Sequence, residues 1–181
     1  MEDHKFEEFL IDRFKKHKEV IRSKTFCKIT KSILNDLLPD VNSKIIDVGC
    51  AFNVYKQFYP KLIGIDFVEH ENVDIVTSIK DFNPEENSFD GAICLGVFHG
   101  DSEYVKQNFQ KVLSWVKKNG YIVMRCRASL PNYEFCLKDP VEWNNKTILE
   151  FENLYNLKRL DIHHTVTKGK TISNVWVWQK N

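Results

Sequence analysis

The stretch KIIDVGCAFNVYKQFYPKLIGIDF, residues 44–67, decides the fold expected for this chain. Its apolar opening, IIDV, predicts a short buried strand that runs into Gly49, where the chain has to turn. The run LIGI predicts a second buried strand that ends at Asp66. Residues Asn53–Tyr59 between them predict about two turns of helix, with Asn53 as the N-cap. Strand, tight turn, helix, strand and acid form a βαβ unit of the kind that binds nucleotide-like ligands.

Each part of this unit has a physical role in holding such a ligand. Gly49 lets the backbone turn sharply and come close to the ligand, because it has no Cβ. The following helix would offer unpaired N–H groups and the positive end of its dipole. Asp66, nineteen positions after Asp47, is expected where a carboxylate accepts two hydrogen bonds from a ribose diol.

Four motifs resemble those of a known family. IIDVGCAFN (45–53) and KLIGIDF (61–67) resemble the first two motifs of the class I S-adenosylmethionine-dependent methyltransferases. ENSFDGAICLGVFHG (86–100) and VKKNGYIVMRCR (116–127) resemble the family's fourth and fifth strands with their flanks. The resemblance implies a three-layer α/β Rossmann-like methyltransferase fold. Its seven-stranded, mostly parallel sheet would have an antiparallel C-terminal strand and would be preceded by two N-terminal helices.

The resemblance also implies S-adenosylmethionine as the cofactor, and no metal ion is expected. His99 follows the apolar strand 91–95, where it can act as a general base for a hydroxyl, amine or acid acceptor, or simply line the loop. Ser78 stands where the family usually has an acid at the adenine amine, and Asp81 is the nearby acidic alternative. The expected cofactor-binding residues are Asp47, Gly49, Cys50, Ala51, Asp66, Phe67, Ser78, Ile79, Leu95 and Gly96.

The chain departs from the family pattern in its first turn. Further glycines usually follow the first one, whereas this chain has Ala51 and Phe52, and Phe52 is expected to pack under the ligand. The expected helix after the turn is also short. These departures favour a second hypothesis, a non-catalytic SAM-binding or interaction module with a degenerate methyltransferase fold. A third hypothesis, a nicotinamide-dependent oxidoreductase, is weakened because its Gly-x-Gly-x-x-Gly motif is absent.

Two amphipathic helices are expected before this unit, over residues 3–20 and 23–38. Residues 13–31 carry eight Lys or Arg and a single acid, Glu19. This charge pattern indicates either a solvated helix face or a contact surface for an anionic substrate, such as RNA or a phosphorylated metabolite.

The remaining elements are expected in the family's order. Asp101 or Ser102 is predicted to cap the long helix that follows the apolar strand. The chain should close with an antiparallel hairpin, which nicotinamide-binding folds normally lack. We expect further strands at 73–76, 121–126, 157–165 and 171–179, helices at 102–118 and 146–153, and a turn at 167–170.

Several other side chains are candidates for a role at the site. Cys50, Cys94 and Cys126 are expected to end three neighbouring strands, as small hydrophobic residues rather than metal ligands. Substrate contacts are expected in the irregular stretch after the fifth strand and at the carboxyl end of that strand. The candidates are Tyr133, Lys138 and Trp143, with Arg125 or Arg127 at the substrate mouth or in a surface salt bridge.

The composition bounds the class of protein. With 181 residues, the chain is expected to form one domain, a helical cap (1–40) on a Rossmann-like core (44–181). A net charge of +1 does not favour a globally basic nucleic-acid binder. Five cysteines without a Cys-x-x-Cys pair argue against disulfides or structural zinc and favour a cytoplasmic protein. No apolar run approaches a membrane span. The methyl acceptor, a small molecule, RNA or protein, is not indicated.

Overall fold

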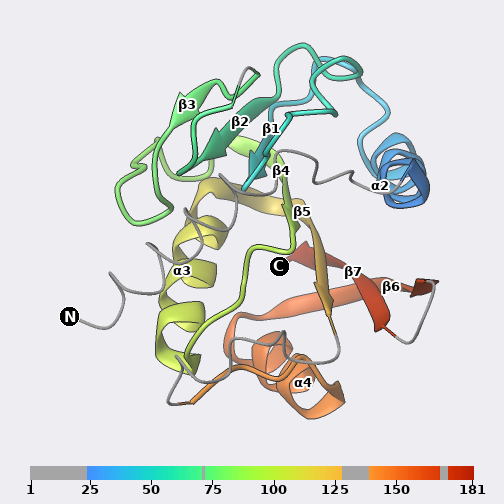
Figure 1. The fold of residues 1–181 in the computed structure, drawn as a ribbon, viewed down its shortest axis with the longest axis vertical. Helices are drawn as coiled ribbons and strands as arrows, with labels where there is room; N and C mark the ends of the chain where they lie inside the picture. Colours follow the sequence, from blue (N-terminus) through green and yellow to red (C-terminus); the bar gives the residue numbers. More distant parts are fainter. Residues whose placement is uncertain (1–23, 71, 128–138, 168–170) are drawn as a thin grey trace.

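The computed structural model describes residues 24–70, 72–127, 139–167 and 171–181 (Figure 1). The strands are β1 (Ile45–Val48), β2 (Ile63–Asp66), β3 (Ile75–Val76), β4 (Phe89–Leu95), β5 (Val116–Arg127), β6 (Leu157–Thr167) and β7 (Thr171–Lys180). They form one seven-stranded sheet in the order β3-β2-β1-β4-β5-β7-β6.

The sheet is parallel except for β7, which runs antiparallel to both β5 and β6. In β1, Val48 pairs with Ile65 of β2 on one side and with Cys94 of β4 on the other. All four residues of β1 are buried, as expected for a parallel strand covered on both faces. The predicted Rossmann-like sheet, mostly parallel with an antiparallel C-terminal strand, is confirmed.

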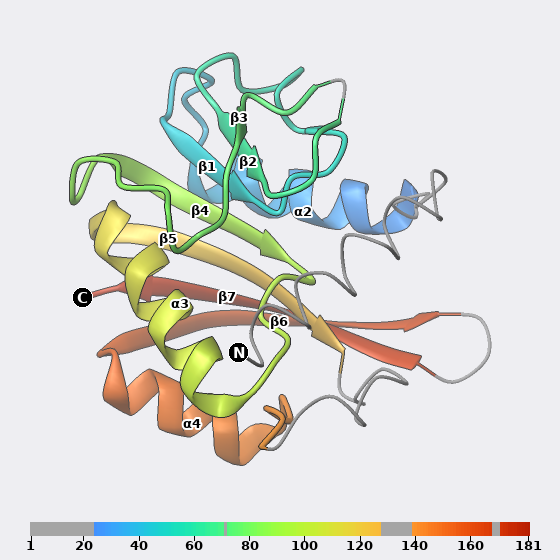
Figure 2. The ribbon, with the colours of Figure 1, turned by 60° about the vertical axis from the view of Figure 1, so that its left-hand side comes forward.

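The helices are α2 (Lys24–Leu37), α3 (Ser102–Trp115) and α4 (Asn145–Leu154). They cover both faces of the sheet (Figures 1 and 2). On one face, Leu34 of α2 packs in an apolar cluster with Tyr55 and Tyr59. On the other face, Phe109 of α3 and Phe151 of α4 meet with ring centroids 5.1 Å apart. The sheet is therefore the middle of three layers.

The predicted helix Asn53–Tyr59 is wrong, because residues 51–58 form successive turns. One of these turns is closed by a hydrogen bond from Asn53 N–H to Cys50 O at 2.9 Å. Ala51 and Asn53 have φ of 47° and 49°. Because no helix begins after Asn53, this residue is not an N-cap.

The predicted helix 102–118 is confirmed only as far as Trp115, where α3 ends. Val116 is extended, with φ −82° and ψ 133°, and already belongs to β5. The ammonium of Lys180 in β7 donates to Leu113 O at 3.1 Å and to Val116 O at 2.7 Å. A residue 64 positions away along the chain therefore satisfies the carbonyl groups at this helix end.

Other predicted elements differ at their ends. β3 is confirmed only over Ile75–Val76, which are exposed. The predicted helix 23–38 is α2, whereas the predicted helix 3–20 lies outside the described residues. Asp101 makes no side-chain cap to α3; its carboxylate accepts a hydrogen bond from Asp139 N–H at 2.9 Å.

The C-terminal elements agree with the predictions. α4, β6 and β7 occur where the sequence placed them, with ends shifted by one or two residues. The four residues Val175–Trp178 of β7 are all buried, as expected for a strand packed on both faces. Residues 168–170 of the predicted turn lie outside the described part of the chain. No helix in the described ranges is long and apolar enough to cross a membrane.

Candidate functional site

The carboxyl ends of β1, β2 and β4 meet at one edge of the sheet, which is where ligands bind in open α/β sheets. Cys50 N–H donates to Ile65 O at 3.0 Å, which fastens the turn after β1 to β2. Ala51 N–H donates to Asp66 Oδ2 at 2.9 Å. These two bonds hold the turn 49–52 against the end of β2.

The Asp66 carboxylate lies inside this edge, and the residue is only 8% exposed. Oδ2 accepts the bond from Ala51, and Oδ1 accepts one from Val68 N–H at 3.0 Å. An ionised carboxylate has about four lone-pair sites, so about two remain for other donors. This geometry is compatible with the predicted role of Asp66 in binding a sugar diol. Phe67, the next residue, is half-buried.

Gly49 is required in the turn for two reasons. Its φ of 62° lies in the left-handed region that glycine adopts without strain. A Cβ at this position would also lie 2.8 Å from Cγ2 of Val97, which follows β4. Val97 therefore packs directly on Gly49, and a larger residue at position 49 would require the Val97 side chain to shift.

Ser78 and Asp81 form a small polar unit after β3. Ser78 Oγ donates to Asp81 Oδ2 at 2.6 Å, and Asp81 N–H donates to Ser78 Oγ at 3.1 Å. Thr77 N–H donates to Asp66 O at 2.8 Å, which ties this segment to β2. Ile79 is half-buried against the apolar core. The structure thus brings together the predicted adenine contact and its acidic alternative.

Two basic side chains converge on Gly96 at the end of β4. Gly96 is exposed, with φ of 78°, and follows the buried Leu95. A Cβ at Gly96 would lie 3.3 Å from Arg125 Nη2 and 4.0 Å from His99 Nε2. Arg125 therefore lies beside Gly96 at the end of β4, and its role at a substrate mouth stays a prediction. The side chain of Arg127 is outside the described part of the structure.

Cys50, Cys94 and Cys126 are buried, form no disulfide, and lie on or beside the neighbouring strands β1, β4 and β5. Burial raises the pKa of the Cys94 thiol well above its ordinary value, and the nearby charge of Asp47 adds to this. Burial also raises the pKa of Cys126. Thiols held protonated are poor metal ligands. Among the described residues, no group of three His, Cys, Asp or Glu is placed to hold a metal ion.

Trp143, the one described candidate among the substrate residues after β5, does not lie at the site edge. Trp143 belongs to the core instead: it is 2% exposed, and its Nε1 donates to Phe98 O at 2.8 Å. Tyr133 and Lys138 lie outside the described residues.

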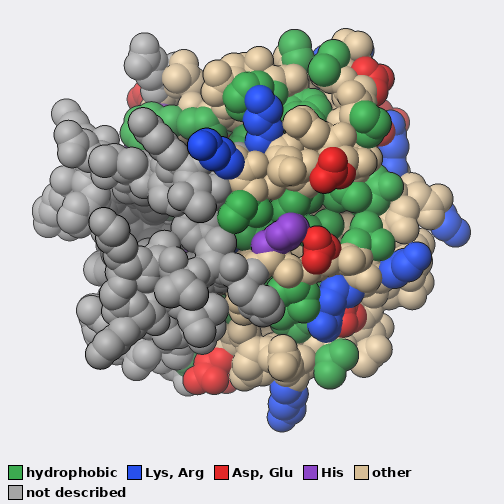
Figure 3. Space-filling view, turned by 90° about the vertical axis from the view of Figure 1, so that its right-hand side faces the viewer, with side chains coloured by type: hydrophobic (Ala, Val, Ile, Leu, Met, Phe, Trp, Pro, Cys, Tyr) green, Lys and Arg blue, Asp and Glu red, His purple; other side chains and the backbone are tan. Residues whose placement is uncertain are grey.

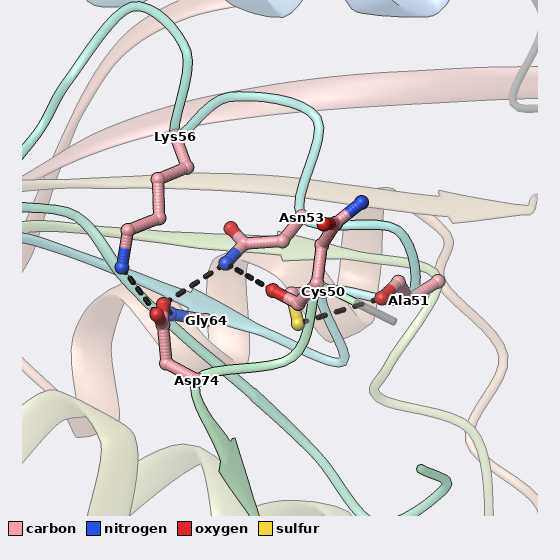
Figure 4. A network of polar contacts seen from close by, with 7 residues as sticks. Cys50, Ala51, Asn53, Lys56, Gly64 and Asp74 are labelled. Carbon is pink, nitrogen blue, oxygen red and sulfur yellow. Dashed lines mark hydrogen bonds and ion pairs between the residues drawn. The ribbon is translucent and has the colours of Figure 1, made fainter. Parts of the chain in front are cut away.

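Sequence reasoning missed a polar cluster that fastens the turns after β1 to the connection between β2 and β3 (Figure 4). Oδ2 of Asp74 accepts hydrogen bonds from Gly64 N–H at 2.8 Å and from Asn53 Nδ2 at 2.9 Å. Its Oδ1 pairs with the Lys56 ammonium. Asn53 Nδ2 also donates to Asn72 O at 2.9 Å. We call Asn53, Lys56 and Asp74 the turn clamp.

Phe52 packs next to the turn clamp. Its ring lies 5.3 Å from the ring of His70, centroid to centroid. A surface cavity of about 590 Å³ adjoins it. The cavity is lined by Phe52, Asn53, Val54, Lys56, Gln57, Asn72, Val73 and Asp74. Phe52 is the one lining residue that belongs to the turn 49–52, and Asp66 is not part of the lining.

The basic stretch 13–31 is only partly described. Within it, Lys31 of α2 lies over the ring of Phe58, 3.7 Å from its centroid, so this cation contributes to packing. On the face in Figure 3, the Lys and Arg side chains of the described residues are scattered among hydrophobic and acidic ones.

Solved structures of low sequence identity share this architecture. The 1,6-didemethyltoxoflavin-N1-methyltransferase of Burkholderia thailandensis, solved with 1,6-didemethyltoxoflavin and S-adenosylhomocysteine, has a TM-score of 0.80 at 13% identity, over 98% of this chain and 89% of that one. The N-methyltransferase NodS of Bradyrhizobium japonicum WM9, solved with S-adenosyl-L-homocysteine, has a TM-score of 0.64 at 12% identity, over 89% and 90% of the two chains. The fold is that of the class I S-adenosylmethionine-dependent methyltransferases.

The class I methyltransferase fold is also found in a protein described as a cyclase. This protein, SpnF, has a TM-score of 0.65 at 12% identity, over 84% of this chain and 80% of that one. No family model matches the sequence, and no curated protein matches it. Likeness at this level of identity fixes the fold, and the chemistry has to be argued from the site.

Proposed function

We propose that this protein is an S-adenosylmethionine-dependent methyltransferase with its cofactor site at the edge formed by β1, β2 and β4. The Asp66 carboxylate carries the proposal, because it is buried at this edge and held between Ala51 N–H and Val68 N–H. Its remaining lone-pair sites suit a ribose diol. The class I fold adds support, since the two methyltransferases compared above were solved with S-adenosylhomocysteine.

The other predicted residues complete the cofactor site in this proposal. Ile79 packs against the adenine ring, and Ser78 or Asp81 accepts a hydrogen bond from its amine. The side chains of Ser78 and Asp81 are hydrogen-bonded to each other, so both lie close enough to contact the same adenine amine. The remaining proposed contacts are Asp47, Gly49, Cys50, Ala51, Phe67, Leu95 and Gly96.

The bound cofactor would supply an electrophilic methyl group, so the chain has mainly to position the acceptor and exclude water. His99, beside Gly96 at the end of β4, is the proposed general base for an acceptor hydroxyl, amine or acid. Arg125, which lies next to Gly96, would orient the acceptor through hydrogen bonds. We propose a small molecule, RNA or protein as the acceptor, and a cytoplasmic location.

Calorimetric titration with S-adenosylhomocysteine tests the cofactor site. Asp66→Ala is expected to weaken binding about tenfold or more, because hydrogen bonds to a charged group contribute about 1.5–3 kcal/mol. Asp36→Ala, on an exposed position of α2, is the matched control and should bind like the wild type. Wild-type protein that binds neither S-adenosylmethionine nor S-adenosylhomocysteine would contradict the proposal.

The turn after β1 favours a second function, cofactor binding without methyl transfer. Ala51 and Asn53 are left-handed there, and residues 51–58 do not supply a helix N-terminus to the edge. The cyclase SpnF has the same fold, so the fold alone does not require methyl transfer. Assays of S-adenosylmethionine conversion with hydroxyl, amine and carboxylate acceptors distinguish methyl transfer from cofactor binding alone. Tight cofactor binding without conversion in any of these assays would favour cofactor binding alone.

A further inference from the structure

We propose that the turn clamp positions the turn 49–52 for cofactor binding, in place of the helix that the chain does not form after β1. This inference rests on the proposed function. It assigns Asn53 and Asp74 as positioning residues, which act through the backbone of the turn rather than by touching the cofactor. Figure 4 shows the clamp reaching from the turns after β1 to the end of the β2–β3 connection.

The clamp and the cofactor edge are linked by one short piece of backbone. Cys50 N–H is fixed to Ile65 O at 3.0 Å, and Asn53 N–H returns to Cys50 O at 2.9 Å. Ala51 lies between these anchors and donates to Asp66 at 2.9 Å. Only one residue, Phe52, separates Ala51 from Asn53 along the chain. A displacement of Asn53 therefore also moves the Ala51 N–H group, which holds the Asp66 carboxylate.

The Asn53 side chain is fixed on several sides. The residue is 4% exposed, and its amide nitrogen donates to both Asn72 O and Asp74 at 2.9 Å. A Cβ at Gly64 would lie only 2.6 Å from Cγ and Nδ2 of Asn53, so the amide rests directly on the backbone of β2. Asparagine is also one of the few residues that tolerate the φ of 49° found here.

Asp74 is the shared acceptor of the clamp. Burial alone would raise the pKa of its carboxyl, but hydrogen bonds from Gly64 N–H, Lys56 and Asn53 lower it. The group is therefore ionised at neutral pH and accepts strong, charge-assisted hydrogen bonds. It joins β2, the turns after β1 and the approach to β3 at a single point.

Affinity for S-adenosylhomocysteine, measured at a temperature where every variant is folded, tests positioning separately from stability. Asn53→Gly keeps the left-handed conformation and removes the amide, so we expect about tenfold weaker binding. Asp74→Asn keeps an acceptor oxygen for Gly64 and Asn53, but it loses the pairing with Lys56 and the negative charge on the two remaining hydrogen bonds. This conservative variant should stay within about threefold of the wild type, because the acceptor geometry is kept and an exposed ion pair contributes little.

Gly64→Ala disturbs the turn clamp from β2, because the added methyl group would collide with the Asn53 amide. It should weaken binding about as much as Asn53→Gly does. In the double variant Asn53→Gly/Gly64→Ala the methyl has room, so the two losses should not add. Affinity within about twofold of the wild type in both single variants, whatever their melting temperatures, would overturn the inference. Wild-type protein that does not bind S-adenosylhomocysteine would instead contradict the proposed function.

Discussion

Ala51 is the residue at which the sequence and the backbone disagree most. Alternate residues of the turn, Gly49, Ala51 and Asn53, have φ of 62°, 47° and 49°, and only the first is glycine. The left-handed region costs an ordinary residue about 1–2 kcal/mol, although asparagine tolerates it better. The missing second glycine was visible in the sequence. The strain it leaves at Ala51 was not, because it depends on the path imposed by Asp66 and the turn clamp.

Ala51→Gly should therefore stabilise the protein. Relief of the left-handed strain, partly offset by the greater backbone entropy of glycine, is expected to raise the free energy of unfolding by about 0.5–1 kcal/mol in urea titrations. Ala92→Gly, at a buried position in the middle of β4, is the control and should lower it. Destabilisation by Ala51→Gly would mean that position 51 is not left-handed in solution.

At the scale of whole elements, long segments with a clear burial pattern were predictable and short ones were not. α4 and β7 occur close to their expected ranges. The turns after β1 do bury Tyr55 and Tyr59, as a helix would have done. Their backbone path depends instead on Asp74, 21 positions after Asn53, and no local pattern contains that contact.

The end of α3 offers a test of such a distant contact. Lys180 donates to Leu113 O and Val116 O, and also to Asn87 Oδ1 at 3.1 Å. Lys180→Met keeps most of the apolar stem and removes these bonds, so the free energy of unfolding should fall by about 1.5–3 kcal/mol. Lys118→Met, at an exposed position nearby, should change it by less than about 0.5 kcal/mol. Equal effects of the two substitutions in urea titrations would show that Lys180 does not hold this helix end.

At the scale of the whole molecule, topology explains which site predictions were possible. Parallel strands place their carboxyl ends together, so Gly49, Asp66 and Gly96 could be assigned to one edge from the strand order alone. The convergence of Arg125 on Gly96 depends on β5 lying next to β4 in a particular register. Trp143 is buried because it packs against Phe151 of α4. This contact could not be predicted from the residues next to Trp143 in the sequence.

The buried thiols at the centre of the sheet predict how the stability of the whole molecule changes with pH. Burial raises the pKa of Cys94 and Cys126 above the unfolded value of about 8.5. Above that pH the unfolded chain releases protons that the folded protein keeps. The thiols therefore contribute their full stability below about pH 8.5, and this contribution is lost as the pH rises further. The slope should approach about 1.4 kcal/mol per pH unit for each thiol.

Urea titrations between about pH 8 and pH 10 measure this slope. Tyr59 and Tyr155, whose pKa values are also raised by burial, act in the same direction at the upper end, whereas Lys180, whose pKa burial lowers, acts in the opposite one. Cys126→Ala should lower the stability below about pH 8.5, because it leaves a small cavity, and should flatten the slope above that pH. Because both thiols lie on central strands, their ionisation requires opening of the sheet itself. A free energy of unfolding that does not change over this range would mean that the centre of the sheet admits water.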